Sequence, residues 1–383
     1  MATRTDLEQI ARDGVAAYQR GDLRAAFTAF GEVTRSGQAS PQMWLMLAQA
    51  ASGLGEIDPA QRALDEVLKD DGRNPFALLM RGDLYAAAGD ERASVAFYRM
   101  GVNACAALPS LPGDLPQRLA KAEGAIAAAN QRFDAHLMGE LKAAGHDHLP
   151  PRMNEALRIA NGECGVQLQQ PTSFYYPGLP QRAWYDAADF GWAAAVEAKA
   201  ERIRAEAEAA LAAGAGIAPY VTAAADRPSR GHSLLDDARW SAFYLWRDGA
   251  PVAGQSDHCP EAMAALASAP MPAIAGRSPM ALFSILRPGT HIQPHHGMLN
   301  TRLICHLPLI VPDGCRLRVG NETRAVVPGR LMIFDDSIQH EAWNDGDAVR
   351  VVMLFEIWRP ELDASERAAL TAMYQAIGNY GSG

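Results

Sequence analysis

Histidine and arginine side chains gather between residues 283 and 362, and their types point to metal and anion chemistry. Histidine is the commonest metal ligand in proteins, and His295 and His340 lie beside short runs suited to β-strands. Arg350 follows His340 by ten residues (350 − 340), inside the apolar run 349–357. A buried guanidinium is costly unless an anion pairs with it, and its planar fork matches a carboxylate. The sequence therefore predicts a carboxylate partner for Arg350, either a bound acid or an internal one such as Glu356.

These side chains can meet only if short strands carry them to one place. Apolar or alternating runs separated by turn-rich pieces indicate strands that close into a barrel or jelly roll. Such runs lie at 301–310, 315–319, 330–334 and 350–358. Residues at even spacing on a strand share a face, so we expect Arg302 and His306 to look into the barrel together. Neighbouring residues face opposite ways, so His295 and His296 are not expected to point at one metal.

Several short motifs occur in one order across this segment. They are Pro-Gly-Thr-His at 288–291, Pro-His-x-Gly at 294–297, His-Leu-x-Leu at 306–309, Phe-Asp-Asp-Ser at 334–337, His-Glu-Ala-Trp at 340–343 and Trp-Arg-Pro-Glu-Leu at 358–362. Through these motifs, roughly the second half of the chain resembles the aspartyl/asparaginyl β-hydroxylase family. The resemblance implies a double-stranded β-helix, a distorted jelly roll of cupin-like form, and an iron(II)- and 2-oxoglutarate-dependent dioxygenase.

The resemblance also implies roles for individual residues. Non-haem iron oxygenases usually hold Fe(II) with two histidines and a carboxylate. The usual carboxylate stands two residues after the first histidine, where this chain has Gly297. The resembled family manages with two histidines and a water, so His295 and His340 are the implied metal ligands. The distal carboxylate of 2-oxoglutarate is expected on Arg350 and Ser284, with O₂ as the other cosubstrate.

The strand that holds Arg302 departs from the resembled pattern. Relatives present a second arginine two residues after the first, where this chain has Ile304. This difference leaves open how the near carboxylate of 2-oxoglutarate is held and whether the substrate side chain is acidic. His306 is expected to contact the cosubstrate rather than the metal. Arg302 is a candidate for binding a carboxylate of the substrate.

The first hundred residues contain an internal repeat. Gly21, Gly55 and Gly89 are separated by 34 residues each (55 − 21 and 89 − 55), and Pro41 and Pro75 keep the same interval. This period is typical of tetratricopeptide repeats, in which paired helices stack into a solenoid. Small residues recur in phase where two helices must approach closely, at Gly14, Ala48 and Gly82.

The sequence thus predicts an α+β multidomain protein, with an all-α solenoid followed by the β-helix domain and its flanking helices. We expect helical repeats over residues 1–110, a connecting helix and linker over 111–165, and the dioxygenase domain over 166–383. Alanine, glutamate and arginine at helical spacing predict a flanking helix over 192–213.

Composition limits the classes of partner. The net charge of −9 and the pI near 5.6 give no basic footprint for nucleic acid. Five cysteines form no metal-finger pair and no disulfide framework. Residues 1–20 carry charges throughout, and no apolar run reaches membrane-spanning length, so we expect a soluble, cytoplasmic protein.

The expected function is hydroxylation of an aliphatic carbon on an amino-acid side chain, by resemblance the β-carbon of Asp or Asn, in a peptide or protein. The repeats favour a polypeptide substrate, because they could engage it on a concave surface. Acceptors that remain open are a small metabolite or a lipid acyl chain. Two further alternatives are a cupin-type isomerase or metal hydrolase on the same barrel, and a repeat-based scaffold with a degenerate oxygenase domain.

Overall fold

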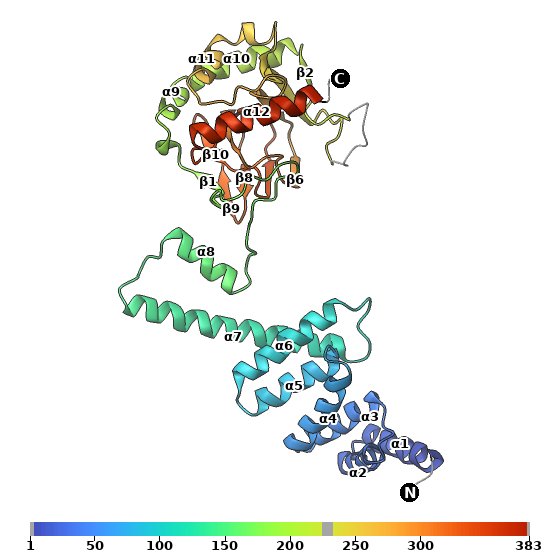
Figure 1. The fold of residues 1–383 in the computed structure, drawn as a ribbon. Coiled ribbons are helices and arrows are strands. Elements are labelled where there is room, and N and C mark those ends of the chain that lie inside the picture. Colours follow the sequence, from blue (N-terminus) through green and yellow to red (C-terminus); the bar gives the residue numbers. More distant parts are fainter. Residues whose placement is uncertain (1–3, 224–232, 381–383) are drawn as a thin grey trace. The chain divides into compact units, whose positions relative to one another are not determined.

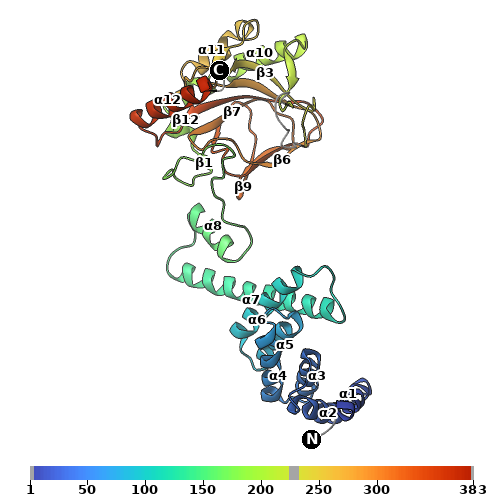
Figure 2. The ribbon, with the colours of Figure 1, turned by 45° about the vertical axis from the view of Figure 1, so that its right-hand side comes forward.

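The structure is a computed structural model that describes residues 4–223 and 233–380. The chain divides into two compact units, Met1–Pro151 and Arg152–Gly383, shown in Figures 1 and 2. The first unit is helical, and the second is built on β-sheets.

The first unit consists of consecutive helices. They are α1 (Arg4–Gln19), α2 (Leu23–Arg35), α3 (Pro41–Gly53), α4 (Ile57–Asp70), α5 (Pro75–Ala87), α6 (Glu91–Ala106) and α7 (Leu115–Ala143). Pairs α1–α2, α3–α4 and α5–α6 pack as helical hairpins. Local sequence explains the helix starts, since the side chains of Asp22, Ser40, Asn74 and Asp90 each accept a backbone N–H at the helix N-terminus.

The repeat expected from the sequence has a physical basis in these hairpins. Gly21, Gly55 and Gly89 have φ of 82°, 76° and 77°, a left-handed conformation that glycine adopts without steric cost, and each stands in the turn between two paired helices. A Cβ on Gly82 would overlap the ring of Tyr98 on the partner helix. The predicted close approach of paired helices, and with it the helical solenoid, is confirmed.

The helix α8 (Pro151–Ala160) starts at the boundary between the units, and the second unit contains two antiparallel sheets. Its strands are β1 (Trp184–Tyr185), β2 (Ile217–Pro219), β3 (Trp240–Arg247), β4 (Ala250–Pro251), β5 (Ala281–Leu286), β6 (Thr290–His295), β7 (Arg302–Ile310), β8 (Cys315–Val319), β9 (Glu322–Ala325), β10 (Met332–Phe334), β11 (His340–Asn344) and β12 (Arg350–Trp358). The large sheet has the order β1-β10-β7-β12-β5-β3-β2, with β4 beside β3, and the small sheet has the order β6-β11-β8-β9. The strands predicted over residues 301–358 all form, with shifts of one or two residues at their ends.

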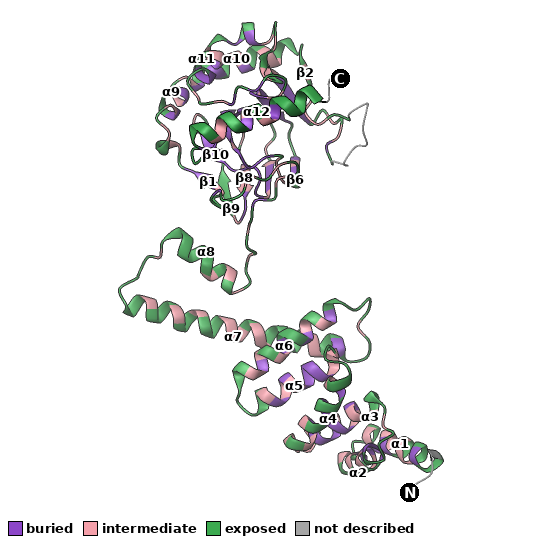
Figure 3. Ribbon diagram, viewed as in Figure 1, coloured by how far each residue is buried: buried purple, intermediate pink, exposed green. Residues whose placement is uncertain are grey.

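The two sheets face each other across an apolar core. Ile292, Leu317 and Ala342 from the small sheet share one buried cluster with Leu282 and Ile304 from the large sheet. This arrangement is the jelly roll expected from the sequence. Figure 3 shows the strands largely buried and much of the helical surface exposed.

Helices cover the outer face of the large sheet. They are α9 (Ala193–Glu197), α10 (Ala200–Ala213) and α11 (Pro260–Leu266), and Figure 2 shows α10 and α11 across the large sheet from β6 and β9. The single helix expected over 192–213 is wrong in detail, because a turn at 198–199 separates α9 from α10. Val196 and Ala200 are buried on either side of that turn, so packing on the sheet outweighs the helix propensity of the alanines. The last helix, α12 (Ala364–Tyr380), buries Leu370 and Tyr374 against the same unit.

Candidate functional site

Strand pairing brings His295 and His340 together. β6 and β11 are antiparallel neighbours in which these two residues are direct partners, and their ring centroids lie 4.1 Å apart. Each Nδ1 contacts a backbone carbonyl two residues earlier in the chain, at 2.8 Å from Gln293 O and 3.1 Å from Ile338 O. A Nδ1–H that donates to a carbonyl places the ring lone pair on Nε2, as is usual for histidines that bind a metal through Nε2.

The electrostatics of His340 favour its neutral form. Burial lowers the pKa of His340 well below its ordinary value, and the neighbouring His295 lowers it further. A metal ion binds the neutral imidazole, so no proton has to be displaced from His340 near neutral pH.

The other two histidines around β6, His291 and His296, have different surroundings. His291 stacks on Trp343, and its Nε2 contacts Glu341 at 2.7 Å. His296 lines the same cavity as His295, contrary to the alternation expected along a strand. The reason is that β6 ends at His295, so the extended geometry behind that expectation stops there.

Gly297 stands where the usual carboxylate ligand would be, and Asp336 explains why it is glycine. A Cβ on Gly297 would overlap the carboxyl group of Asp336, and the backbone N–H of Gly297 donates to the Asp336 carbonyl at 2.6 Å. Among residues 4–223 and 233–380, no group of three or more His, Cys, Asp or Glu side chains could hold a metal ion. His295 and His340 remain the two metal ligands that the resemblance implies.

Asp336 was part of a motif noted in the sequence, but no role was predicted for it. Its side chain lines the cavity and is buried, and its Oδ1 has no hydrogen-bond partner. Burial raises the pKa of Asp336 to about 7, although the charge of Arg302 opposes this.

Arg350 is buried in the same cavity, and no described residue forms an ion pair with it. It is 2% exposed, and its Nε and Nη2 have no hydrogen-bond partner. Burial lowers the pKa of Arg350 to about 10. The internal salt bridge with Glu356, which the sequence left open, is wrong because Glu356 pairs with Arg302. A buried guanidinium in this state is complementary to a carboxylate that enters the cavity.

Ser284 and His306 complete the surroundings of Arg350. Ser284 lies on β5, which pairs with β12, and its hydroxyl accepts a hydrogen bond from Trp240 Nε1 at 3.1 Å. His306 lies on β7, and its Nδ1 has no partner. Burial lowers the pKa of His306 well below its ordinary value, and the charge of Arg350 lowers it further. Both residues line the cavity, as does Ile304, whose side chain offers no hydrogen bond.

All six predicted site residues thus line one cavity of about 220 Å³ between the sheets. Its lining includes the polar residues Ser284, His295, His296, Arg302, His306, Asp336, His340 and Arg350, and the apolar residues Val221, Trp240, Met280, Ile292, Met298, Ile304, Leu317, Phe334 and Leu354. The arrangement suits a metal ion and a small acid in an otherwise apolar chamber.

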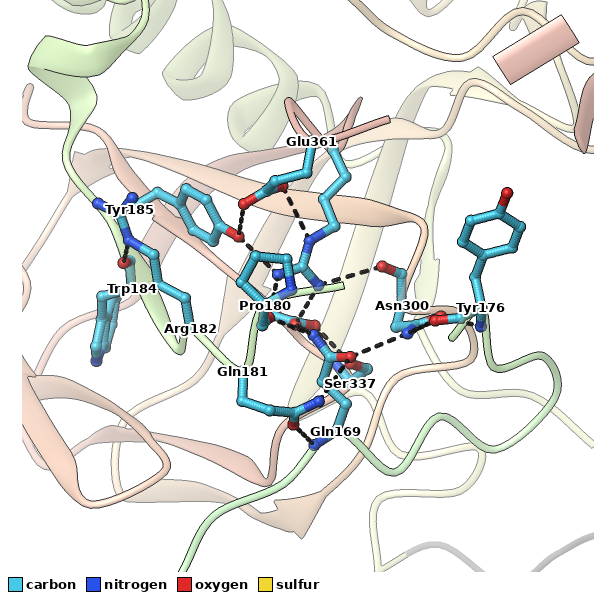
Figure 4. A network of polar contacts seen from close by, with 12 residues as sticks. Gln169, Tyr176, Pro180, Gln181, Arg182, Trp184, Tyr185, Asn300, Ser337 and Glu361 are labelled. Carbon is cyan, nitrogen blue, oxygen red and sulfur yellow. Dashed lines mark hydrogen bonds and ion pairs between the residues drawn. The ribbon is translucent and has the colours of Figure 1, made fainter. Parts of the chain in front are cut away.

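A buried polar network that the sequence analysis did not predict surrounds Asp335, the residue before Asp336 (Figure 4). Arg359 and Asp335 form an ion pair at 2.6 Å, and both side chains are fully buried. Asp335 also accepts hydrogen bonds from Gln169 Nε2 at 2.7 Å and from the Ser337 hydroxyl at 2.6 Å. Since Asp335 immediately precedes Asp336, the network fixes the turn that carries Asp336 and leads into β11.

Fold and site together define a double-stranded β-helix whose interior holds a histidine pair and an arginine without a counter-ion. Residues 197–360 match the sequence model of the family described as Aspartyl/Asparaginyl beta-hydroxylase. This part of the second unit is therefore similar to the aspartyl/asparaginyl β-hydroxylase family.

Two relatives with different named activities are similar to this chain. The aspartyl/asparaginyl beta-hydroxylase of Homo sapiens is 36% identical over 142 residues, which cover 37% of this chain and 19% of the human protein. The ornithine lipid ester-linked acyl 2-hydroxylase of Rhizobium tropici is 35% identical over 188 residues, 48% of this chain and 63% of that enzyme. The match thus spans about a fifth of the length of the human protein and less than two thirds of the bacterial one.

Solved structures similar to this chain resemble its helical part. PcrH from Pseudomonas aeruginosa has a TM-score of 0.30 at 19% identity, covering 33% of this chain and 94% of PcrH. The Sgt2 TPR domain from Aspergillus fumigatus has a TM-score of 0.29 at 18% identity, covering 34% of this chain and 85% of that domain. Within the described part of the chain, no helix combines the length and apolar character needed to cross a membrane.

Proposed function

We propose that this protein is an iron(II)- and 2-oxoglutarate-dependent dioxygenase that hydroxylates an aliphatic carbon of an amino-acid side chain in a peptide or protein. The observation that carries the proposal is the buried, unpaired guanidinium of Arg350 in the same cavity as the His295–His340 pair. A metal ion with open positions and a cation for a dicarboxylic acid are the two requirements of this chemistry.

The residues present fit the two groups. The Nε2 atoms of His295 and His340 would hold the metal, and Arg350 with the hydroxyl of Ser284 would bind the distal carboxylate of 2-oxoglutarate. When bound, iron with 2-oxoglutarate and O₂ supplies the oxidant, giving succinate, CO₂ and a hydroxylated product. The apolar lining from Leu317, Phe334 and Leu354 keeps water away from the reacting groups.

Asp336 and His306 would assist from the cavity wall. His306, neutral because of burial and of Arg350, can donate or accept one hydrogen bond near the cosubstrate without adding charge. The carboxyl group of Asp336 packs against Gly297, two residues after His295.

A polypeptide acceptor is supported by the first unit. Its hairpins form a hollow of about 630 Å³ lined by residues of α2, α3 and α4, including Phe27, Trp44 and Arg62. Such a surface suits an extended peptide. A lipid acyl chain is the second candidate acceptor, favoured by the apolar residues Val221, Met280 and Met298 in the cavity and by the named activity of the Rhizobium relative.

The decisive experiment measures succinate formed from 2-oxoglutarate with Fe(II) and O₂. We expect turnover by the full chain and its loss in His340→Ala, with an unchanged circular dichroism spectrum. His291→Ala is the matched control, since His291 lies on β6 but stacks on Trp343. Equal succinate yield from His340→Ala and the unaltered protein would refute the ligand assignment. No turnover by the unaltered protein would favour the isomerase, hydrolase or scaffold alternatives.

A further inference from the structure

A cluster of three charged side chains forms one wall of the cavity. Arg302 opens β7, pairs with Glu356 on β12, and lies 3.6 Å from a carboxyl oxygen of Asp336. Glu356 is fully buried, and its other carboxyl oxygen accepts the backbone N–H of Met280 at 3.1 Å. Glu356 is therefore held from two sides, and an incoming ligand cannot displace it from Arg302 without leaving a buried carboxylate unpaired.

The charges of this wall decide which substrates it can accept. Among the described residues that line the cavity, the permanent cations are Arg302 and Arg350. Since Arg350 is assigned to 2-oxoglutarate, Arg302 is the cation that could receive an acidic substrate. It is already paired with the buried carboxylate of Glu356 and lies 3.6 Å from a carboxyl oxygen of Asp336, so a further carboxylate would find its positive charge already compensated in a site shielded from water.

The next inward-facing position on β7, Ile304, supplies no second cation for an acidic substrate. Ile304 shares the inward face of β7 with Arg302 and His306, and it is the direct partner of Glu356 in the β7–β12 register. It is 4% exposed and contributes only apolar surface. The position that could have supplied a second cation thus lowers the polarity of the wall.

The unpaired atoms of the cluster indicate what it can receive. Arg302 Nε is a donor without a partner, and Asp336 Oδ1 is a carboxyl oxygen without a partner. A carboxamide has one acceptor oxygen and one donor NH₂ group, so it could satisfy both without adding charge. A carboxylate has no hydrogen to donate, so it could not satisfy an acceptor oxygen of Asp336 in this way.

We propose that Glu356 is a specificity-determining residue. By neutralising the charge of Arg302, it disfavours binding of a carboxylate at the acceptor subsite. The hydroxylated side chain is therefore uncharged, and a carboxamide is the polar group that fits the subsite. This inference rests on the proposed function and narrows its substrate class. It assigns Glu356 a positioning role through Arg302, without contact with the reacting atoms.

The test uses the full chain with peptides that are identical except for one central residue, Asn, Asp or Leu. Oxygen incorporation is measured by mass spectrometry, and kcat and KM are determined for each peptide. Succinate formed without peptide is measured in parallel. We expect kcat/KM for the Asn peptide to exceed that for the Asp peptide at least tenfold, with most of the difference in KM.

Two variants then test whether the neutralised charge of Arg302 causes the preference for the Asn peptide. Glu356→Gln keeps the shape and the contact with Met280 but returns a net positive charge to Arg302, so the Asn-to-Asp ratio should fall at least tenfold. Ile304→Arg, which leaves Glu356 in place, should lower the same ratio. Glu322→Gln, an equal change of charge on the exposed strand β9, is the control in which the ratio should stay within twofold.

The outcomes separate this inference from the proposed function. Absence of succinate with and without peptide would overturn the dioxygenase itself. Succinate formation with preference for the Asp peptide, or with no peptide oxidised, would overturn the uncharged side chain as acceptor while leaving the dioxygenase standing. An unchanged ratio in a folded, active Glu356→Gln protein would overturn the role of Glu356.

Discussion

Replacing Arg350 by methionine should make the protein more stable in the absence of 2-oxoglutarate and unable to bind that ligand. The two effects have one cause. Arg350 is 2% exposed, and two of its guanidinium nitrogens have no partner, so the folded protein bears the cost of a buried charge. Methionine retains apolar packing of the side-chain stem and removes the charge.

The magnitude follows from the electrostatics of this site. Burial lowers the pKa of Arg350 by more than two pH units from its ordinary value, to about 10. At 1.36 kcal/mol per pH unit, burial disfavours the charged form by about 3 kcal/mol relative to the unfolded chain. Because methionine is shorter than arginine and fills the site less completely, we expect the variant to be stabilised by about 1–3 kcal/mol. In the unaltered protein, 2-oxoglutarate at a hundred times its dissociation constant should add about 2.7 kcal/mol, and this gain should vanish in the variant.

The assay is urea denaturation of both proteins with and without 2-oxoglutarate. Mn²⁺ is present in place of Fe(II), so that no oxidation takes place. Arg287→Met, at an exposed position just after β5, is the matched control and should change stability by less than about 0.5 kcal/mol. Loss of stability in Arg350→Met without 2-oxoglutarate would refute the argument from buried charge. Stabilisation of Arg350→Met by 2-oxoglutarate equal to that of the unaltered protein would refute the assignment of the ligand.

Three further perturbations test other parts of the site. Gly297→Ala should destabilise the protein by about 1–3 kcal/mol, because its Cβ overlaps the Asp336 carboxyl group, and Asp336→Ala in the same chain should recover most of the loss in a double-mutant cycle. Asp335→Asn removes the shorter of the two ion pairs of the fully buried Arg359, whose other partner is Glu361 at 3.2 Å, and should cost about 1–3 kcal/mol in urea denaturation. Because burial and Arg350 depress the pKa of His306, the unfolded chain takes up a proton that the folded chain does not as pH falls below about 6.5. Stability should therefore be full above that pH and decline below it, with a smaller decline in His306→Gln between pH 7.5 and 5.5.

For each of these three predictions, one experimental result would contradict the reasoning. Additive effects of Gly297→Ala and Asp336→Ala would mean that the two positions do not interact. A cost for Asp335→Asn no larger than that of Asp189→Asn, which removes an exposed partner of Arg182, would contradict the network in Figure 4. A pH dependence unaltered by His306→Gln would assign the decline to other groups, such as His340.

Much of the fold was visible in local patterns. The 34-residue period identified the helical hairpins because each repeat needs the same turn glycine and the same small residue where its helices meet. The runs at 315–319 and 350–358 became β8 and β12 at the predicted residues, since both alternate or stay apolar between clear turns. Prediction failed where packing competes with propensity, as at the turn between α9 and α10.

Several of the residues that share the cavity could also be predicted from the sequence. His295, His340, Arg350 and Ser284 could be chosen because their motifs occur in order, and the strand register places all four on one cavity. The pairing of Arg302 with Glu356 could not be chosen, because the two residues are 54 apart and meet only through the β7–β12 register. The sequence offered several acids as partners and no means to rank them.

By itself, the amino-acid sequence determined that this chain has a repeating helical part and a strand-rich part with two histidines and an arginine in apolar surroundings. Those features follow from periodicity and from the cost of burying charge, which act locally. Only the tertiary structure decided which charges are compensated. Arg350 is left without a counter-ion and Arg302 is neutralised, because the order and register of antiparallel strands bring the acids Glu356 and Asp336 to one arginine and not to the other.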